Sequence, residues 1–126
     1  MAAPATVDDY IAGFPPEVSA RLTRVRSEIV DGVTAASGSR PEEKMRYGIA
    51  AIMLGGRYAL HFAGWKKHIG LYPVPRLPDP LESEIAPYRA EKDSVVLPHA
   101  KDIPYDLIGR VAREVADERV RQSAKD

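Results

Sequence analysis

The chain contains no cysteine. This absence excludes disulfide bonds, thiolate zinc sites, iron–sulfur ligation by thiolates and catalysis by a thiol nucleophile. It fits a reducing compartment, and we expect the cytoplasm. The first ten residues lack a basic region followed by an apolar run, so no signal peptide is expected. The longest strongly apolar run, Ile49–Leu54, is far too short to span a membrane.

Acidic residues are missing from one long stretch of the chain. The 18 basic and 18 acidic side chains balance overall, yet no aspartate or glutamate occurs between Lys44 and Pro78. The stretch holds six cations: Lys44, Arg46, Arg57, Lys66, Lys67 and Arg76. A basic surface of this kind attracts phosphates and other anions, although the same residues also suit solvated strands and turns. The neutral overall charge argues against nucleic acid as the partner.

Motifs of known catalytic and nucleotide-binding classes are also missing. The patterns G-x-x-x-x-G-K-[ST], G-x-G-x-x-G, H-E-x-x-H and G-x-S-x-G do not occur. Serine, histidine and aspartate are present, but no spacing links them into a nucleophile, a base and an orienting group. We therefore expect a binding protein rather than an enzyme.

The pattern of apolar residues predicts a single α+β domain, which suits a chain of 126 residues. Helices are predicted at about 7–13, 16–36, 77–88 and 104–120, and strands at about 44–47, 49–54, 57–65, 68–73 and 94–97. The central strands follow one another directly and so predict an antiparallel β-meander, packed against the N- and C-terminal helices. Beyond Glu118 the chain is polar, and we expect it to fray.

The second predicted helix has the clearest apolar stripe. Its members recur at spacings of four and three residues: Val18, Leu22, Val25, Ile29 and Val33. Pro16 suits the first turn of this helix, and Gly38 suits its left-handed C-terminal end. We expect the stripe to pack against the apolar face of the central strands, formed by Leu60, Phe62, Ile69 and Leu71.

A turn at Lys66-Lys67 would fix the register of the central hairpin. It pairs His61 with Tyr72 and Trp65 with His68. Alternation then gathers four large polar or aromatic side chains on the face away from the core, above small residues: His61, Trp65, His68 and Tyr72 over Ala59, Ala63 and Gly70. Lysine is a poor residue for a two-residue turn, so a longer loop that uses Gly64 is the alternative. His61 and Tyr72 stay on the non-core face in either case.

Two interpretations of this face remain open. Such residues are common in strands that pack beneath a covering helix or loop. They also form shallow binding surfaces, here for a small anionic or aromatic ligand or for a protein partner. The candidate ligand-binding residues are Tyr47, His61, Trp65, Lys66, Lys67, His68 and Tyr72. If the ligand is an anion, its affinity should depend on Lys66, Lys67 and Arg57.

Two segments of the chain, Glu43–Ile52 and Tyr58–Pro73, are characteristic of a known family. Similar segments occur at Val7–Ile11, Ile85–Tyr88 and Ile103–Ile108, so the similarity covers nearly the whole chain. On these segments the chain resembles the YdhG-like family, long catalogued as a domain of unknown function. Lys67–Pro73 is the most specific part. Ala50 stands where the family usually has a proline.

The resemblance implies an α+β fold with the same meander, and it suggests a function. Some relatives are described as frataxin-like intracellular iron chaperones, so the resemblance implies iron as the cofactor and iron-receiving proteins as partners. His68 lies in the most specific segment and is the first candidate ligand, with His61 as a weaker one. Further donors are needed, and the acidic candidates are Asp79, Glu82 and Glu84, or Asp8, Asp9 and Glu17 if folding brings these closer.

Overall fold

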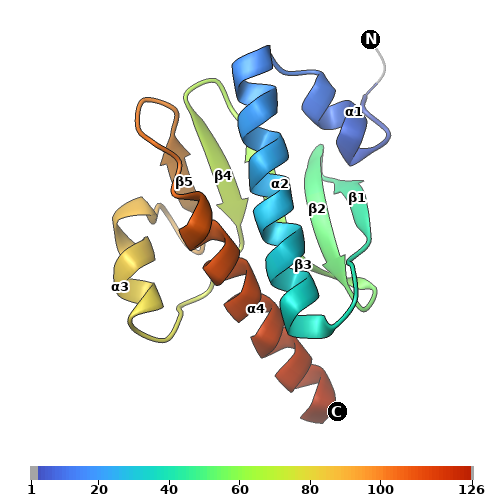
Figure 1. Ribbon diagram of the computed structural model, residues 1–126, viewed down its shortest axis with the longest axis vertical. Coiled ribbons are helices and arrows are strands. Elements are labelled where there is room, and N and C mark those ends of the chain that lie inside the picture. Colours follow the sequence, from blue (N-terminus) through green and yellow to red (C-terminus); the bar gives the residue numbers. More distant parts are fainter. Residues whose placement is uncertain (1–2, 126) are drawn as a thin grey trace.

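The computed structural model describes residues 3–125 as a five-stranded antiparallel sheet with two long helices on one face (Figure 1). The strands are β1 (Glu43–Arg46), β2 (Ile49–Leu54), β3 (Arg57–Gly64), β4 (His68–Tyr72) and β5 (Val95–Pro98), and they neighbour one another in chain order. The helices are α1 (Val7–Ala12), α2 (Pro16–Ser37), α3 (Leu81–Ile85) and α4 (Tyr105–Lys125), with a 3-10 turn at Ala86–Tyr88. The predicted α+β fold, an antiparallel meander between N- and C-terminal helices, is confirmed.

Local signals in the sequence set several element ends. The Thr6 hydroxyl accepts a hydrogen bond from the Asp9 N–H at 3.1 Å and caps α1. Gly38 adopts a φ of 83° and ends α2 in the left-handed conformation. Gly55 and Gly56, with φ of 61° and 81°, form the two-residue turn between β2 and β3.

The third helix is shorter than the predicted span of 77–88. Residues 77–80 are not helical, and α3 begins only at Leu81. Pro78 and Pro80 explain the difference, because a proline disfavours helical geometry in the residue before it and lacks a backbone N–H. The prediction of an α-helix over 77–80 is therefore wrong.

The last helix is longer than predicted. It continues to Lys125 instead of fraying after Glu118, and Arg121 forms an ion pair with Glu118 at 2.6 Å within this extra length. Tyr47 is not part of the first strand, because it forms a turn with Gly48 in which both residues have positive φ. The α-helix α3 ends at Ile85, and the 3-10 turn Ala86–Tyr88 completes the predicted span. The remaining helix and strand ends lie within one residue of their predicted positions.

The hydrophobic core lies between the sheet and the pair α2 and α4. Leu22, Val25 and Ile29 of the predicted stripe are fully buried, and Val18 is half-buried against the same cluster. The facing side chains of β3 and β4 are fully buried too: Leu60, Phe62, Ile69 and Leu71. The predicted packing of the stripe against these strands is confirmed.

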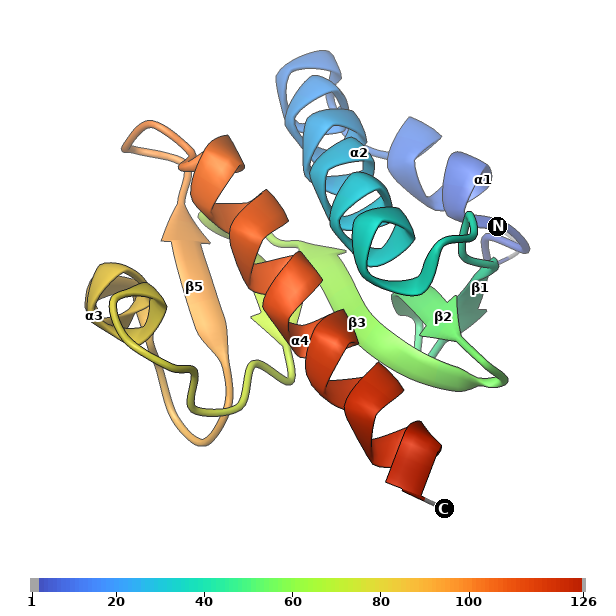
Figure 2. The ribbon, with the colours of Figure 1, turned by 60° about the horizontal axis from the view of Figure 1, so that its bottom comes forward.

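The two long helices approach each other closely at Gly32. A Cβ atom at Gly32 would lie 2.6 Å from the carbonyl oxygen of Gly109 and 2.9 Å from the backbone nitrogen of Arg113. Glycine therefore lets α2 and α4 meet backbone to backbone. Both helices lie on the same side of the sheet, and no helix or strand within residues 3–125 covers its other side, which we call the outer face (Figure 2). None of these helices combines the length and the apolar character needed to cross a membrane.

Truncation of Leu22 tests the assignment of the core. Leu22 is 0% exposed, so Leu22→Ala should lower the free energy of unfolding by roughly 2–5 kcal/mol through lost burial and a residual cavity. Urea denaturation followed by circular dichroism measures the change. Val120→Ala is the control, because Val120 is 39% exposed on α4 and should lose much less. An unchanged unfolding midpoint for Leu22→Ala would contradict the assignment.

Candidate functional site

The register of the strands decides which side chains lie on the outer face. His61 pairs with Tyr72 on one side and with Ala51 on the other. The Trp65 N–H donates to the His68 carbonyl at 2.8 Å, so Lys66 and Lys67 form a two-residue connection and the predicted register is confirmed. By alternation, the outer face of β1 to β4 carries Lys44, Arg46, Ala51, His61, Ala63, Trp65, His68, Gly70 and Tyr72. A β-bulge between Ile52 and Met53 adds Met53 and Tyr58 to this face. The prediction that Ala59 lies on this face is wrong, because after the bulge Ala59 is buried in the hydrophobic core.

The Lys66-Lys67 turn is stabilised from outside by His99, in the loop between β5 and α4. Neither lysine has the positive φ that two-residue hairpin turns usually require. The His99 backbone N–H donates to the Lys67 carbonyl at 2.9 Å, and His99 Nε2 donates to the Trp65 carbonyl at 3.1 Å. Hydrogen bonds from His99 therefore stabilise a turn that lacks the glycine or asparagine usually found in two-residue turns. Sequence reasoning gave it no role.

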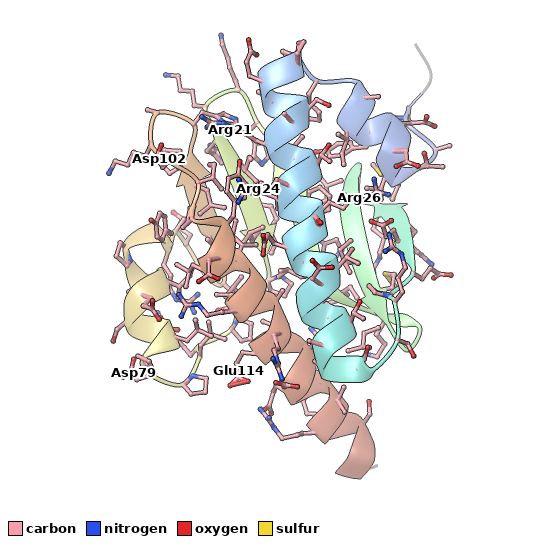
Figure 3. All side chains as sticks on the ribbon, in the orientation of Figure 1. Arg21, Arg24, Arg26, Asp79, Asp102 and Glu114 are labelled. Carbon is pink, nitrogen blue, oxygen red and sulfur yellow. The ribbon has the colours of Figure 1, made fainter. Side chains whose placement is uncertain are left out.

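Arg21 in turn holds His99. Its Nη1 lies 3.3 Å from His99 Nδ1 and donates to the His99 carbonyl oxygen at 3.0 Å. Figure 3 shows Arg21 on α2, beside the loop between β5 and α4. Because Nδ1 accepts a hydrogen bond from Arg21, the ring proton is on Nε2, which donates it to the Trp65 carbonyl.

Small residues form the floor of the outer face. Ala51 and Ala63 are fully buried although they lie outside the main hydrophobic core, so the larger side chains around them must cover them. A Cβ atom at Gly70 would collide with the Tyr72 hydroxyl group, which therefore lies over this glycine. Trp65 Nε1 donates to that hydroxyl oxygen at 3.0 Å. The structure thus brings Trp65, Gly70 and Tyr72 together as the pattern predicted.

Aromatic rings are exposed at this face. Within residues 3–125 the large apolar side chains classed as exposed are Tyr47 at 85%, Trp65 at 47% and Val120 at 39%. Two of the three belong to the outer face or its rim. The Tyr47 ring lies 6.2 Å from the His61 ring, between their centres. Exposed aromatic groups of this kind are typical of binding surfaces.

A second group of side chains surrounds Tyr58. The guanidinium carbons of Arg46 and Arg119 lie 5.1 Å and 4.7 Å from the centre of its ring, and the His61 ring lies 5.0 Å away. Arg119 comes from α4, far from β3 in sequence. Both arginines make cation–π contacts with Tyr58. We call Arg46, Tyr58, His61 and Arg119 the Tyr58 site. Tyr58, Arg46 and Arg119 were not predicted as ligand-binding residues.

His61 is buried within the Tyr58 site. It is 6% exposed, and its Nδ1 donates to the Tyr72 carbonyl at 3.2 Å. Its Nε2 is buried and has no hydrogen-bond partner within residues 3–125. Burial lowers the pKa of His61, the bond to Tyr72 raises it, and the charges of Arg46 and Arg119 lower it further, so the net shift is downward. The imidazole is therefore neutral at pH 7, with a lone pair on Nε2.

The two histidines predicted as metal ligands lie apart. His61 faces Tyr72, and His68 is four residues from Tyr72 along β4, which corresponds to about 13 Å. They cannot bind one metal ion together. No group of three histidine, aspartate or glutamate side chains that suits a metal ion occurs in the part of the chain that the structure describes.

Several of the acidic residues proposed as iron ligands have partners of their own. Glu82 accepts from Arg89 Nε at 2.7 Å and from Arg76 at 3.1 Å, and these bonds, Arg89 foremost, lower the pKa of Glu82 to about 2. The others pair with different residues: Glu84 with Arg110 at 2.7 Å, Asp79 with the Ser83 hydroxyl at 2.8 Å and Asp8 with Arg26 at 2.6 Å. Figure 3 shows Arg26 on the side of α2 that faces β1. Iron binding at His68 stays a prediction from resemblance.

The predicted anion-binding set divides into two places. Arg57 begins β3, whereas Lys66 and Lys67 follow its other end. The separation along the strand is on the order of 25–30 Å, too long for one small anion to contact both. One small anion can therefore contact the Lys66-Lys67 turn or the opposite end of β3, near Tyr58, but not both.

Comparison with known proteins gives the chain no relatives. No family model, no curated protein and no solved structure matches it. Membership of the YdhG-like family stays a prediction, and the function has to be argued from the residues themselves.

Comparison of His99→Ala with His68→Ala tests which histidine supports the turn. His99→Ala should lower the free energy of unfolding by about 1–3 kcal/mol, because it leaves the Trp65 carbonyl and Arg21 without their partner. His68→Ala should change the melting temperature less. Thermal melts measure both. An unchanged melt for His99→Ala would contradict the role given to it.

Anaerobic titration with ferrous iron on the same two variants tests the predicted metal ligand. If His68 binds iron, His68→Ala should lower iron affinity and leave the far-UV circular dichroism unchanged, whereas His99→Ala should keep its affinity. Equal iron uptake by the two variants and the wild type would remove His68 as a ligand.

The buried imidazole of His61 should make stability depend on pH. Its pKa in the folded protein lies below the ordinary value of 6.5, so the unfolded chain binds a proton that the folded protein does not. The contribution is complete above about pH 6.5 and is lost as the pH falls from there through the lowered pKa. Urea denaturation at several pH values should show a smaller loss for His61→Asn than for the wild type. Equal slopes would show that His61 is not the cause.

Proposed function

We propose that the protein is a small non-enzymatic binding protein whose ligand lies on the outer face and combines an aromatic ring with an anionic group. The observation that carries this proposal is an uncovered sheet face that exposes Tyr47 and Trp65 and carries cations without any carboxylate on β1 to β4 beyond Glu43. We place this function in the cytoplasm, which a chain without cysteine fits.

The aromatic part of the ligand is suggested by the exposed rings. Trp65 is fixed by its hydrogen bond to the Tyr72 hydroxyl, so its indole presents a preorganised face. Tyr47 projects from its turn with most of its surface free. Between them, Ala51, Ala63 and Gly70 are buried beneath larger side chains, so a ligand would contact those side chains rather than the small residues. Stacking on such rings is worth about 1–3 kcal/mol for each ligand ring.

The anionic part of the ligand is suggested by the unbalanced charge of the outer face. Lys44 and Arg46 point to this face, and the Lys66-Lys67 turn borders it. Glu43, the acid nearest in sequence, points to the opposite side, where it binds Arg26 at 2.6 Å. Glu43 therefore does not offset the charges of Lys44 and Arg46 on the outer face, which favours anions.

Iron delivery, the function that the resemblance implies, has less support from the geometry. His61 and His68 are too far apart to share an ion. Glu82 and Glu84, two of the acidic candidates, are held in ion pairs with arginines of the fold. By contrast, Tyr47 and Trp65 of the outer face are already exposed to a ligand.

The fluorescence of Trp65 tests the proposed function directly, because it is the single tryptophan and is 47% exposed. The panel consists of nucleoside monophosphates and aromatic carboxylates, each beside its uncharged and its non-aromatic counterpart. An aromatic anion should change the fluorescence saturably and bind more tightly than either counterpart. Tyr47→Ala should weaken this binding roughly fivefold or more.

Val120→Ala is the matched control, since it shortens an exposed apolar side chain on α4, away from Tyr47 and Trp65. It should leave binding unchanged. If no aromatic anion in the panel binds saturably, or if Tyr47→Ala and Val120→Ala behave alike, the outer face is not the binding surface.

A further inference from the structure

Five arginines are half-buried within residues 3–125, and two of them differ from the rest. Three donate to a carboxylate or a carbonyl: Arg21 to His99, Arg26 to Asp8 and Glu43, and Arg89 to Glu82 and Val74. Arg46 donates only to the Tyr47 hydroxyl at 3.4 Å, and no side-chain hydrogen bond or ion pair of Arg119 occurs among the described residues. Both unpaired arginines lie on Tyr58.

The buried polar atoms without partners gather at the same place. Within the described chain they are His61 Nε2 and Arg119 Nε. Buried polar groups are normally hydrogen-bonded, and an unpaired one costs free energy. Here one is an acceptor and the other a donor, and both belong to side chains that pack on the Tyr58 ring. A ligand that supplies an acceptor for the arginines and a donor for His61 would satisfy the site.

We propose that the Tyr58 site binds a phosphate group, the anionic part of the ligand. This assignment rests on the proposed function and gives its anionic group a chemical identity and a position. The guanidinium groups of Arg46 and Arg119 donate to phosphate oxygens, the geometry that guanidinium forms best. His61 Nε2 and a phosphate oxygen share one proton in a hydrogen bond. Tyr47, whose ring lies near His61, is then placed to stack on the aromatic part.

The shared proton is what selects phosphate over other anions. A neutral Nε2 accepts a hydrogen bond only from an oxygen or nitrogen that carries a proton. Inorganic phosphate keeps a proton at every pH used below, and a phosphate monoester, whose second pKa is about 6, keeps one on part of its population near neutral pH. Carboxylate and sulfate oxygens carry none at that pH. Carboxylate and sulfate can form a hydrogen bond with Nε2 only when His61 itself is protonated.

Among the described residues, no acidic side chain acts on His61 and would compete with the ligand. The charged or titratable side chains that face it are Lys44 and Arg46 from β1, Tyr47 from the turn, Tyr58 from β3, Tyr72 from β4 and Arg119 from α4. A bound anion offsets the two guanidinium charges that disfavour a proton on His61. Binding should therefore tighten as the pH falls.

Calorimetric titration of the full chain with inorganic phosphate and with sulfate, at equal ionic strength, tests the proposal. At about pH 8 inorganic phosphate still carries one proton, and it should bind roughly tenfold more tightly than sulfate. At about pH 5.5 the difference should shrink, because a bound anion favours a proton on His61 Nε2, which can then donate to sulfate as well. Equal affinities at about pH 8, or no phosphate binding at either pH, would overturn the proposal.

Three variants locate the site. His61→Asn keeps an amide donor for the Tyr72 carbonyl and removes Nε2, so it should lose the preference for phosphate. Arg119→Gln should lower the affinity for phosphate and for sulfate roughly tenfold at both pH values. Lys66→Gln combined with Lys67→Gln removes two charges beyond the other end of β3 and should weaken phosphate binding much less than Arg119→Gln does. Far-UV circular dichroism verifies that each variant is folded.

The variants also separate this proposal from the proposed function. If the Lys66 and Lys67 double variant loses phosphate and Arg119→Gln does not, the anion lies at the hairpin turn. In that case the assignment to the Tyr58 site is overturned, while a ligand on the outer face still stands. If aromatic anions change Trp65 fluorescence and inorganic phosphate never binds, the outcome is the same. Arg46→Gln provides a second loss-of-binding variant should Arg119→Gln unfold.

Discussion

The close approach of α2 and α4 is the constraint on which the rest of the molecule depends. Because a side chain at Gly32 would meet the backbone of Gly109, only glycine allows the two helices this separation. At that distance both fit on one face of the sheet, and they seal the core there. No helix of the part of the chain that the structure describes covers the outer face (Figure 2). Its buried alanines, Ala51 and Ala63, are sheltered by side chains of the sheet itself.

Alternation along β3 and β4 predicted most of the residues that share the outer face, but a β-bulge places Ala59 in the core and Tyr58 beside His61, which alternation did not predict. Once the turn is located, a period of two assigns each side chain to one side, and His61 opposite Tyr72 follows directly. The turn itself was harder to predict, because its lysines contradict turn preferences. Its support comes from His99, in a loop on the other side of β5, and no local pattern reveals such a contact.

The same limit applies to the charges at the candidate site. The sequence shows that acids and bases are segregated, but only the fold shows how the acids are used. Glu84 pairs with Arg110 between α3 and α4, and Glu82 pairs with Arg89, so their carboxylates do not neutralise the outer face. Arg119 reaches Tyr58 from the last helix, in a segment expected to fray. The stretch without acids therefore forms a cationic surface because the acids elsewhere pair with other residues in the fold. Composition alone does not show this pairing.

Tyr47 has two opposing effects: its backbone conformation lowers the stability of the turn, and its exposed ring is available to a ligand. Its φ of 54° is one that glycine or asparagine adopts more easily, and a larger side chain there costs on the order of 1 kcal/mol. The ring recovers little of this through burial, because it is 85% exposed. Selection for a robust fold alone would replace the tyrosine with asparagine. Engineering this hairpin for thermal tolerance would therefore remove the side chain that a ligand meets first, a trade-off between durability and affinity confined to one turn.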